Sequence, residues 1–273
     1  MLSACGLAMV MISGGIDLSI GYMASLCGIV AAMLMKNMNV NFIVSIIAAI
    51  LVGTLCGALN GILSNKLKIH TMIVTLATMT LFQGLSYIIS QSKSFSSLPA
   101  AFKFIGQGYL GNLPVSIFAL IAIVAVVSFI LNKTHYGRYV YAIGGNPDAA
   151  HLAGINVERV RLRTFALNGA LVGLAAVLLI SRSGSASSAM GTSLQFDSIT
   201  ACILGGVSFT GGSGKVSNAV LGVLCLGVLS NGMQLIGWGI YVQYVVKAIL
   251  LVIAIAFDMY TKNKVLADDA ANG

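Results

Sequence analysis

Charged side chains are scarce in this sequence. Lys, Arg, Asp and Glu make up 8% of its 273 residues, whereas about a quarter of the residues of a soluble domain are charged. Hydrophobic residues supply 58% of the chain, and its mean hydropathy is +0.97. This composition excludes a soluble globular domain and indicates a membrane protein.

Motifs for disulfide, metal and nucleotide chemistry are also missing. The five cysteines lie in apolar runs without C-x-x-C spacing, so neither a disulfide framework nor a zinc site is predicted. The segment GGSGK at 211–215 is not a phosphate-binding loop, because Phe209 and Val216 stand where that motif needs Gly and Ser or Thr. No cluster of nucleophile, base or metal ligands is recognisable. We therefore expect a chain that is not an enzyme, binds no metal or cofactor and does not hydrolyse ATP by itself.

Basic residues outnumber acidic ones by 15 to 7, which gives a net charge of +8. Aromatic residues do not interleave with these bases, so nucleic acid is not an expected partner. The bases instead cluster in short segments between apolar runs, where they act as orientation signals for membrane insertion. The three clusters are Lys66 with Lys68, the segment 133–163, and Lys262 with Lys264.

Continuous apolar runs of about 17–25 residues recur along the chain and are long enough to cross a bilayer as helices. They do not alternate as barrel strands do. We predict an all-α fold, a polytopic transmembrane helical bundle that forms a single transmembrane domain over residues 1–273. The expected spans are 1–13, 18–35, 42–63, 71–90, 114–131, 164–181, 198–210, 216–236 and 240–258.

The number of spans between the basic clusters is even, which returns the chain to the same side each time. The positive-inside rule places all three clusters in the cytoplasm. Loop 91–113 and segment 182–197 then face outward, and segment 211–215 faces inward. Because Met1 starts almost inside an apolar run, we expect that a first span is missing and that a complete chain has ten.

Polar residues inside the spans are costly and mark candidate functional positions. Asp17 follows Gly14 and Gly15, so it either caps a helix at the membrane edge, lies in a broken helix that lines a pathway, or carries a proton. The Asn and Gln side chains in the spans either form hydrogen bonds between helices or line a path along which they bind a neutral, hydroxyl-rich solute. The candidate pathway residues are Asp17, Ser19, Asn60, Gln83, Asn168, Gln195, Asp197, Asn231 and Gln234.

Glycines spaced by four occur within the predicted span 42–63, at Gly53, Gly57 and Gly61. Small residues at this spacing let another helix approach closely. Packing within the chain is the default interpretation, and a dimer seam is the alternative.

The stretch YAIGGNPDAAHLAGINVERVR, residues 141–161, is unusually polar for this chain. Asn146 is a good N-cap, Pro147 suits the first helical position and Gly154 reads as the residue past the end. A helix of two turns is marginal in water, so it must pack on this chain or on a partner. The candidate site residues of this predicted short helix and its flanks are Gly144, Gly145, Asn146, Pro147, Asp148, Ala149, Ala150, Leu152, Ala153 and Gly154.

Three separated motifs resemble the permease subunits of ribose- and xylose-type ABC importers. They are GGIDLSIG at 14–21, GRYVYAIGGNPDAAHLAGI at 137–155 and AMGTSLQFDSITACILGGVSFTGGSGK at 189–215. The similarity covers essentially the whole chain. It implies a ten-span permease for a monosaccharide such as ribose, located in the bacterial cytoplasmic (inner) membrane.

The same resemblance implies the partners. These are a second permease copy or a sister subunit, ABC ATPase subunits that bind the ATP, and an extracytoplasmic sugar-binding protein. By motif position, the helix from Gly145 to Gly154 would sit in a cleft of the ATPase. Segment 182–197, with Gln195 and Asp197, would lie where the binding protein docks or the sugar enters.

Two other functions remain open from the residues alone. The chain could be an ABC permease for another small polar solute, such as a furanone signal or a branched-chain amino acid. It could also be a secondary transporter driven by an ion gradient, with Asp17 as the coupling group.

Overall fold

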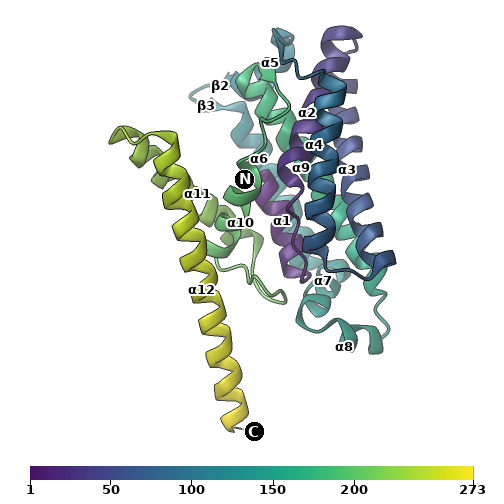
Figure 1. The fold of residues 1–273 in the computed structure, drawn as a ribbon, viewed down its shortest axis with the longest axis vertical. Helices are drawn as coiled ribbons and strands as arrows, with labels where there is room; N and C mark the ends of the chain where they lie inside the picture. Colours follow the sequence, from purple (N-terminus) through teal and green to yellow (C-terminus); the bar gives the residue numbers. More distant parts are fainter. Residues whose placement is uncertain (273) are drawn as a thin grey trace.

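The computed structural model describes residues 1–272, which are almost entirely helical (Figure 1). Four two-residue strands form two short antiparallel pairs: β1 (Phe95–Ser96) with β4 (Ser185–Ala186), and β2 (Tyr109–Leu110) with β3 (Leu113–Pro114). The helices are α1 (Leu2–Ile12), α2 (Ile20–Asn37), α3 (Phe42–Leu67), α4 (Thr71–Ser90), α5 (Ala100–Gln107), α6 (Val115–Lys133), α7 (His135–Gly145), α8 (Pro147–Leu152), α9 (Val157–Ser183), α10 (Leu194–Leu204), α11 (Val216–Leu235) and α12 (Ile240–Asn272).

Within the described residues, seven helices are long and apolar enough to cross a membrane: α2, α3, α4, α6, α9, α11 and α12. The predicted helical membrane bundle is therefore confirmed. The count of nine full spans is not, because α1 and α10 contain 11 residues each. At 1.5 Å per residue, each is about 16 Å long, roughly half of a hydrocarbon core of about 30 Å.

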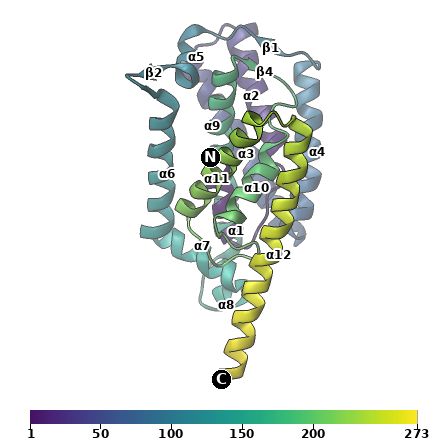
Figure 2. The same ribbon diagram turned by 90° about the vertical axis from the view of Figure 1, so that its left-hand side faces the viewer.

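Helix α1 lies in the centre of the bundle, and all of its residues are buried. Its sequence is apolar on every side, as expected for a helix surrounded by protein. It packs against α9, α10 and α11, with α6 and α7 also in contact. Figure 2 shows it behind α10 and α11, with α6 and α4 on opposite flanks. The short central helix thus connects α6, α7, α9, α10 and α11.

Helices α3 and α9 form the most extensive helix pair. A Cβ atom on Gly53 would overlap the carbonyl oxygen of Gly169, and one on Gly57 would overlap that of Phe165. The glycines of α3 therefore pack within the chain, as predicted, and α9 contributes matching glycines at Gly169 and Gly173.

The two ends of the bundle differ in their elements (Figure 1). One end carries α5 and the strand pairs, and the other carries α7 and α8 (Figure 2). Asn65, next to the first basic cluster, donates a hydrogen bond to the Glu158 carbonyl in the second (2.8 Å). The clusters predicted to be cytoplasmic thus meet at the α7–α8 end, which we call the basic end.

Replacing Gly57 with Leu should prevent the close approach of α3 and α9, because the new side chain meets backbone that cannot yield. We expect a loss of at least about 3 kcal/mol of stability, the upper part of the usual overpacking range. Gly84→Leu is the matched control, since no atom lies within 4 Å of a Cβ at that position. Thermal unfolding of the two detergent-purified variants measures the difference, and equal midpoints would contradict the α3–α9 contact.

Candidate functional site

Helix α8 forms as its sequence predicts. The Asn146 side-chain oxygen accepts hydrogen bonds from the backbone N–H groups of Asp148 and Ala149, both at 3.0 Å. Pro147 is the first helical residue. Gly154 has φ +82°, the left-handed conformation that glycine adopts without strain. Local capping alone therefore defines both ends of this helix.

The apolar residues of α8 do not lie on one side of the helix. Ala150 is 4% exposed and points into the chain's own bundle, whereas Leu152 is 88% exposed. Ala149 and Ala153 are exposed as well. Ala150 therefore anchors α8 to this protein, and Leu152 is the large apolar side chain presented outward. Ala150 and Leu152 do not share one surface, because residues two positions apart on an α-helix point about 200° apart around its axis.

Four glycines join α7 to the rest of the bundle at the basic end. A Cβ on Gly144 would overlap the carbonyl oxygen of Ile12, and one on Gly211 would lie 2.7 Å from the Cα of Gly14. The Gly212 N–H donates a hydrogen bond to the Ile12 carbonyl at 2.9 Å. We call Gly14, Gly144, Gly211 and Gly212 the glycine junction. There the end of α7, the end of α1 and the loop 205–215 touch backbone to backbone.

Side chains of α7 and of one further helix, α12, reinforce this junction. The Tyr141 hydroxyl on α7 donates to the Gly214 carbonyl at 2.8 Å, and burial raises the pKa of this phenol, so it stays protonated as a donor. On α12, the Asp258 carboxylate accepts from the Phe209 N–H at 3.0 Å, and the Lys262 ammonium contacts the Thr210 hydroxyl. The loop 205–215 thus connects α7 with α1, α10, α11 and α12.

A buried polar cluster forms around Asp17, which is fully inaccessible to solvent. One carboxylate oxygen accepts from the Ser19 N–H (2.9 Å) and the Ser19 hydroxyl (2.6 Å). The other accepts from the Asn168 amide at 2.8 Å. Asn60 donates to the Ser19 hydroxyl at 2.8 Å. Four of the residues predicted from sequence, from three separate segments, therefore meet at one point.

The link 13–19 between α1 and α2 is not helical, and apart from the exposed Gly14 and the half-buried Leu18 its residues are buried. Its Ile16 N–H donates to the Thr71 hydroxyl (3.0 Å) and its Leu18 N–H to the Thr75 hydroxyl (3.1 Å). The residue that begins α2 is Ser19, not Asp17. Asp17 is therefore not itself the N-cap of α2, and its place at the membrane edge, in a pathway or on a proton route stays a prediction. The helix interruption is enclosed by protein, as such backbone must be wherever it lies at membrane depth.

Two amide oxygens of this cluster, on Asn60 and Asn168, are buried and have no hydrogen-bond partner among the protein atoms that the structure describes. The Asn168 oxygen lies against Gly6 of α1, where a Cβ would be 2.4 Å away. A side chain at position 6 would therefore displace the amide that holds Asp17.

The remaining predicted residues do not join the Asp17 cluster. Gln195 is buried near Gly21, and Gln83 on α4 is partly buried. Asn231 and Gln234 are exposed on α11. Asp197 on α10 instead pairs with Lys247 on α12, with 2.9 Å between the ammonium nitrogen and a carboxylate oxygen. Sequence reasoning missed Lys247, although a lone base in the apolar run 240–258 carried the same signal as Asp17.

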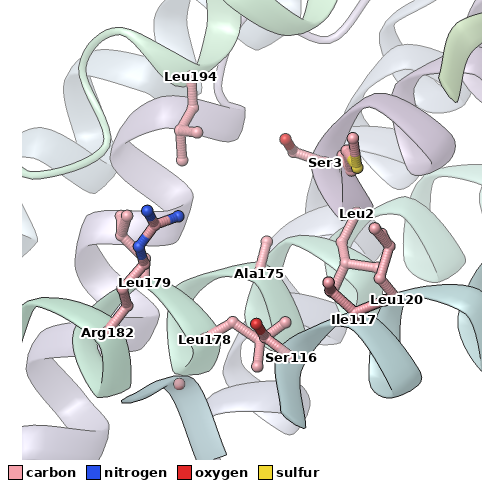
Figure 3. Close-up of a pocket in the computed structure, with 12 residues that line it drawn as sticks. Leu2, Ser3, Ser116, Ile117, Leu120, Ala175, Leu178, Leu179, Arg182 and Leu194 are labelled. Atoms are coloured by element: carbon pink, nitrogen blue, oxygen red, sulfur yellow. The ribbon is translucent and has the colours of Figure 1, made fainter. Parts of the chain in front are cut away.

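Several cavities adjoin these helices. One of about 490 Å³ lies between α10 and α12 and contains the Asp197–Lys247 pair among its lining residues. Another, of about 260 Å³, lies between α1, α6 and α9 (Figure 3). Arg182 is one of its lining side chains, beside Leu179 and Leu194, and its lining includes none of the predicted site residues.

A family model described as "Branched-chain amino acid transport system / permease component" matches residues 1–255. The chain belongs to this permease family. It is 38% identical to the L-arabinose transport system permease protein of Escherichia coli, over 94% of this chain and 78% of the relative. It is 39% identical to the ribose import permease protein of Bacillus subtilis, over 94% and 80%. No solved structure matches.

Membership of this family and the seven membrane-length helices make the chain a multi-pass permease of the inner membrane. The resemblance found in the three sequence motifs is therefore confirmed. The roles expected for individual residues stay predictions, and the geometry above shows which of them are close enough to act together.

Gly144→Val is expected to open the glycine junction, because the new methyl groups overlap backbone of α1 and of loop 205–215. Gly145→Val is the matched control, since a Cβ on the adjacent glycine meets nothing within 4 Å. We expect the first variant to be less stable by about 3 kcal/mol. It should also expose residues 205–215 to limited proteolysis, while the second should behave as wild type. Identical digestion patterns for the two variants would refute the junction.

Proposed function

We propose that the chain is the membrane permease subunit of an ABC importer and passes a monosaccharide into the cell. The observation that carries this proposal is the capped helix α8, which stands at the basic end with Leu152 outward and connects to the core through the glycine junction. A permease that is driven by a separate ATPase needs an exposed element that the ATPase can bind, and this element must be joined to the core by rigid contacts. The similarity to arabinose and ribose permeases supports the same assignment.

The mechanism follows from these contacts. Partner ATPase subunits bind ATP and close, and this closure displaces α8 and, with it, α7. Gly144 of α7 meets the last turn of α1 and loop 205–215 through backbone atoms, so the displacement reaches α1, α10 and α12. For ATP to drive this change, it must bind the two states of the complex with different affinity.

We assign the ATPase and the binding protein to opposite ends of the bundle. The ATPase meets the basic end around α8. An extracytoplasmic binding protein meets the opposite end, near α5 and the β1–β4 pair, and a second copy or a sister subunit completes the pathway. The binding protein delivers the solute, so its identity sets much of the selectivity.

A neutral solute fits the charges of the described spans. The Asp17 carboxylate is surrounded by neutral donors, and the Asp197–Lys247 pair carries no net charge. An amino acid is the second candidate, because a zwitterion could also match that pair and because the family model bears that name.

Uptake in the host measures the function directly. Deleting the chain should abolish transport of a labelled pentose from a panel of D-ribose, L-arabinose and D-xylose, and re-expression should restore it. Vanadate should block this uptake, since it inhibits ABC ATPases. Loss of L-leucine uptake instead would support the amino acid permease. Uptake that resists vanadate but collapses with a protonophore would support an ion-coupled transporter and direct attention to Asp17.

Leu152→Asp is expected to weaken ATPase binding at least tenfold, because it places a charge on the exposed apolar anchor of α8; a tenfold loss corresponds to about 1.4 kcal/mol. Asn132→Asp is the control, since it adds the same charge to an exposed position at the same end. The measurement is the amount of ATPase that co-purifies with the tagged permease from host membranes. Equal recovery with both variants would count against docking through α8.

A further inference from the structure

The ion pair between Asp197 and Lys247 stands apart from the Asp17 cluster and joins two different helices. The side chains of Lys247 and Asp197 retain 20% and 36% exposure. Lys247 is about two turns inside α12, a helix of membrane-spanning length. Ionised side chains at such depth face the protein interior or a water-filled cavity, because hydrocarbon does not solvate them. We therefore expect water rather than lipid beside this partly exposed pair.

The space beside the pair is a cavity of about 490 Å³ between α10 and α12. Cavities of about 300–1,000 Å³ are typical of small-molecule sites. Phe196 and Tyr244 line it with partly exposed aromatic rings. Thr192, Ser193 and Thr200 add hydroxyl groups.

We propose that this cavity is a transit site for the monosaccharide, in which Asp197 accepts and Lys247 donates hydrogen bonds to sugar hydroxyls. This inference rests on the proposed function and names the residues that the solute meets. The aromatic rings of Phe196 and Tyr244 can cover the C–H faces of a sugar ring, which are its apolar part. The pair presents an acceptor and a donor side by side, with no net charge to retain an ion.

The mostly apolar lining suits transit rather than storage. A solute on a translocation path must bind strongly enough to enter and weakly enough to leave. One charged pair and a few hydroxyls give directional contacts without enclosing the sugar. Tight recognition is then left to the extracytoplasmic binding protein.

Both walls of the cavity are connected to the basic end. From Asp197, helix α10 continues to Leu204, after which loop 205–215 begins. From Lys247, helix α12 continues past Asp258, whose carboxylate accepts a hydrogen bond from the Phe209 N–H of that loop. A shift of the glycine junction therefore reaches both α10 and α12, and it can change the width of the cavity between them.

The test is cysteine accessibility in the assembled importer. We would replace the five native cysteines and place one cysteine at Ala248, which lines the cavity, or at Val245, an exposed neighbour on α12 outside it. A charged methanethiosulfonate reagent reacts with thiols in water and not with thiols in lipid. We expect labelling of A248C at least tenfold faster than that of V245C, and slower labelling of A248C when D-ribose or L-arabinose is present together with the binding protein and ATP.

Two results would overturn the transit site. If A248C labels no faster than V245C, lipid or protein fills the cavity. If it labels quickly but neither sugar slows the reaction, the cavity is wet but lies off the sugar path. Either result can coexist with vanadate-sensitive pentose uptake by the wild-type importer, so the transit site can fail while the proposed function stands.

A second pair of variants gives the transport readout. Ala248→Phe should lower the sugar transported per ATP hydrolysed at least tenfold by filling the cavity, while the ATPase stays bound and active. Val245→Phe introduces the same ring outside the cavity and should leave the ratio unchanged. Parallel loss of ATPase binding and uptake in A248F would indicate a structural role for the cavity and contradict the proposal.

Discussion

Every backbone amide in the hydrocarbon region needs a partner within the protein, and the architecture of this permease depends on how that demand is met at one interruption. The link between α1 and α2 is not helical and is mostly buried. It persists because the hydroxyls of Thr71 and Thr75 accept from its N–H groups and because Asp17 binds Ser19. Helices α3 and α9 can supply Asn60 and Asn168 to the same point because their glycines let them approach closely.

Backbone contacts through glycine recur where parts of the chain must move as one. At the glycine junction, α7, α1 and loop 205–215 touch without intervening side chains, so little of a displacement is absorbed by rotamer changes. Tyr141 and Asp258 fasten the same loop to α7 and α12. Helices α7 and α8 are thereby connected to the cavity between α10 and α12 by main-chain atoms and a few polar side chains.

Charge is used differently at each depth. Basic residues cluster towards helix ends and in short loops, where the sequence predicts that they orient the chain; Asp17 is buried among neutral donors; and Asp197 and Lys247 compensate each other beside a cavity. An uncompensated ion on a lipid-facing surface would be costly. The scarcity of charge in the sequence and the placement of the few exceptions therefore have the same physical cause.

The sequence by itself determined the membrane class, the position of most helices and the caps of α8 at Asn146 and Gly154. These features depend on hydropathy, charge and backbone preference, which are properties of residues that lie close together in the sequence. Only the tertiary structure decided that Asp17 meets Asn168, 151 residues away, that Asp197 pairs with Lys247, and that Ala150 points inward while Leu152 points out. Apolar helices of similar composition carry no local record of their neighbours, and the order in which they pack is set by side-chain and glycine contacts that form only in the folded bundle.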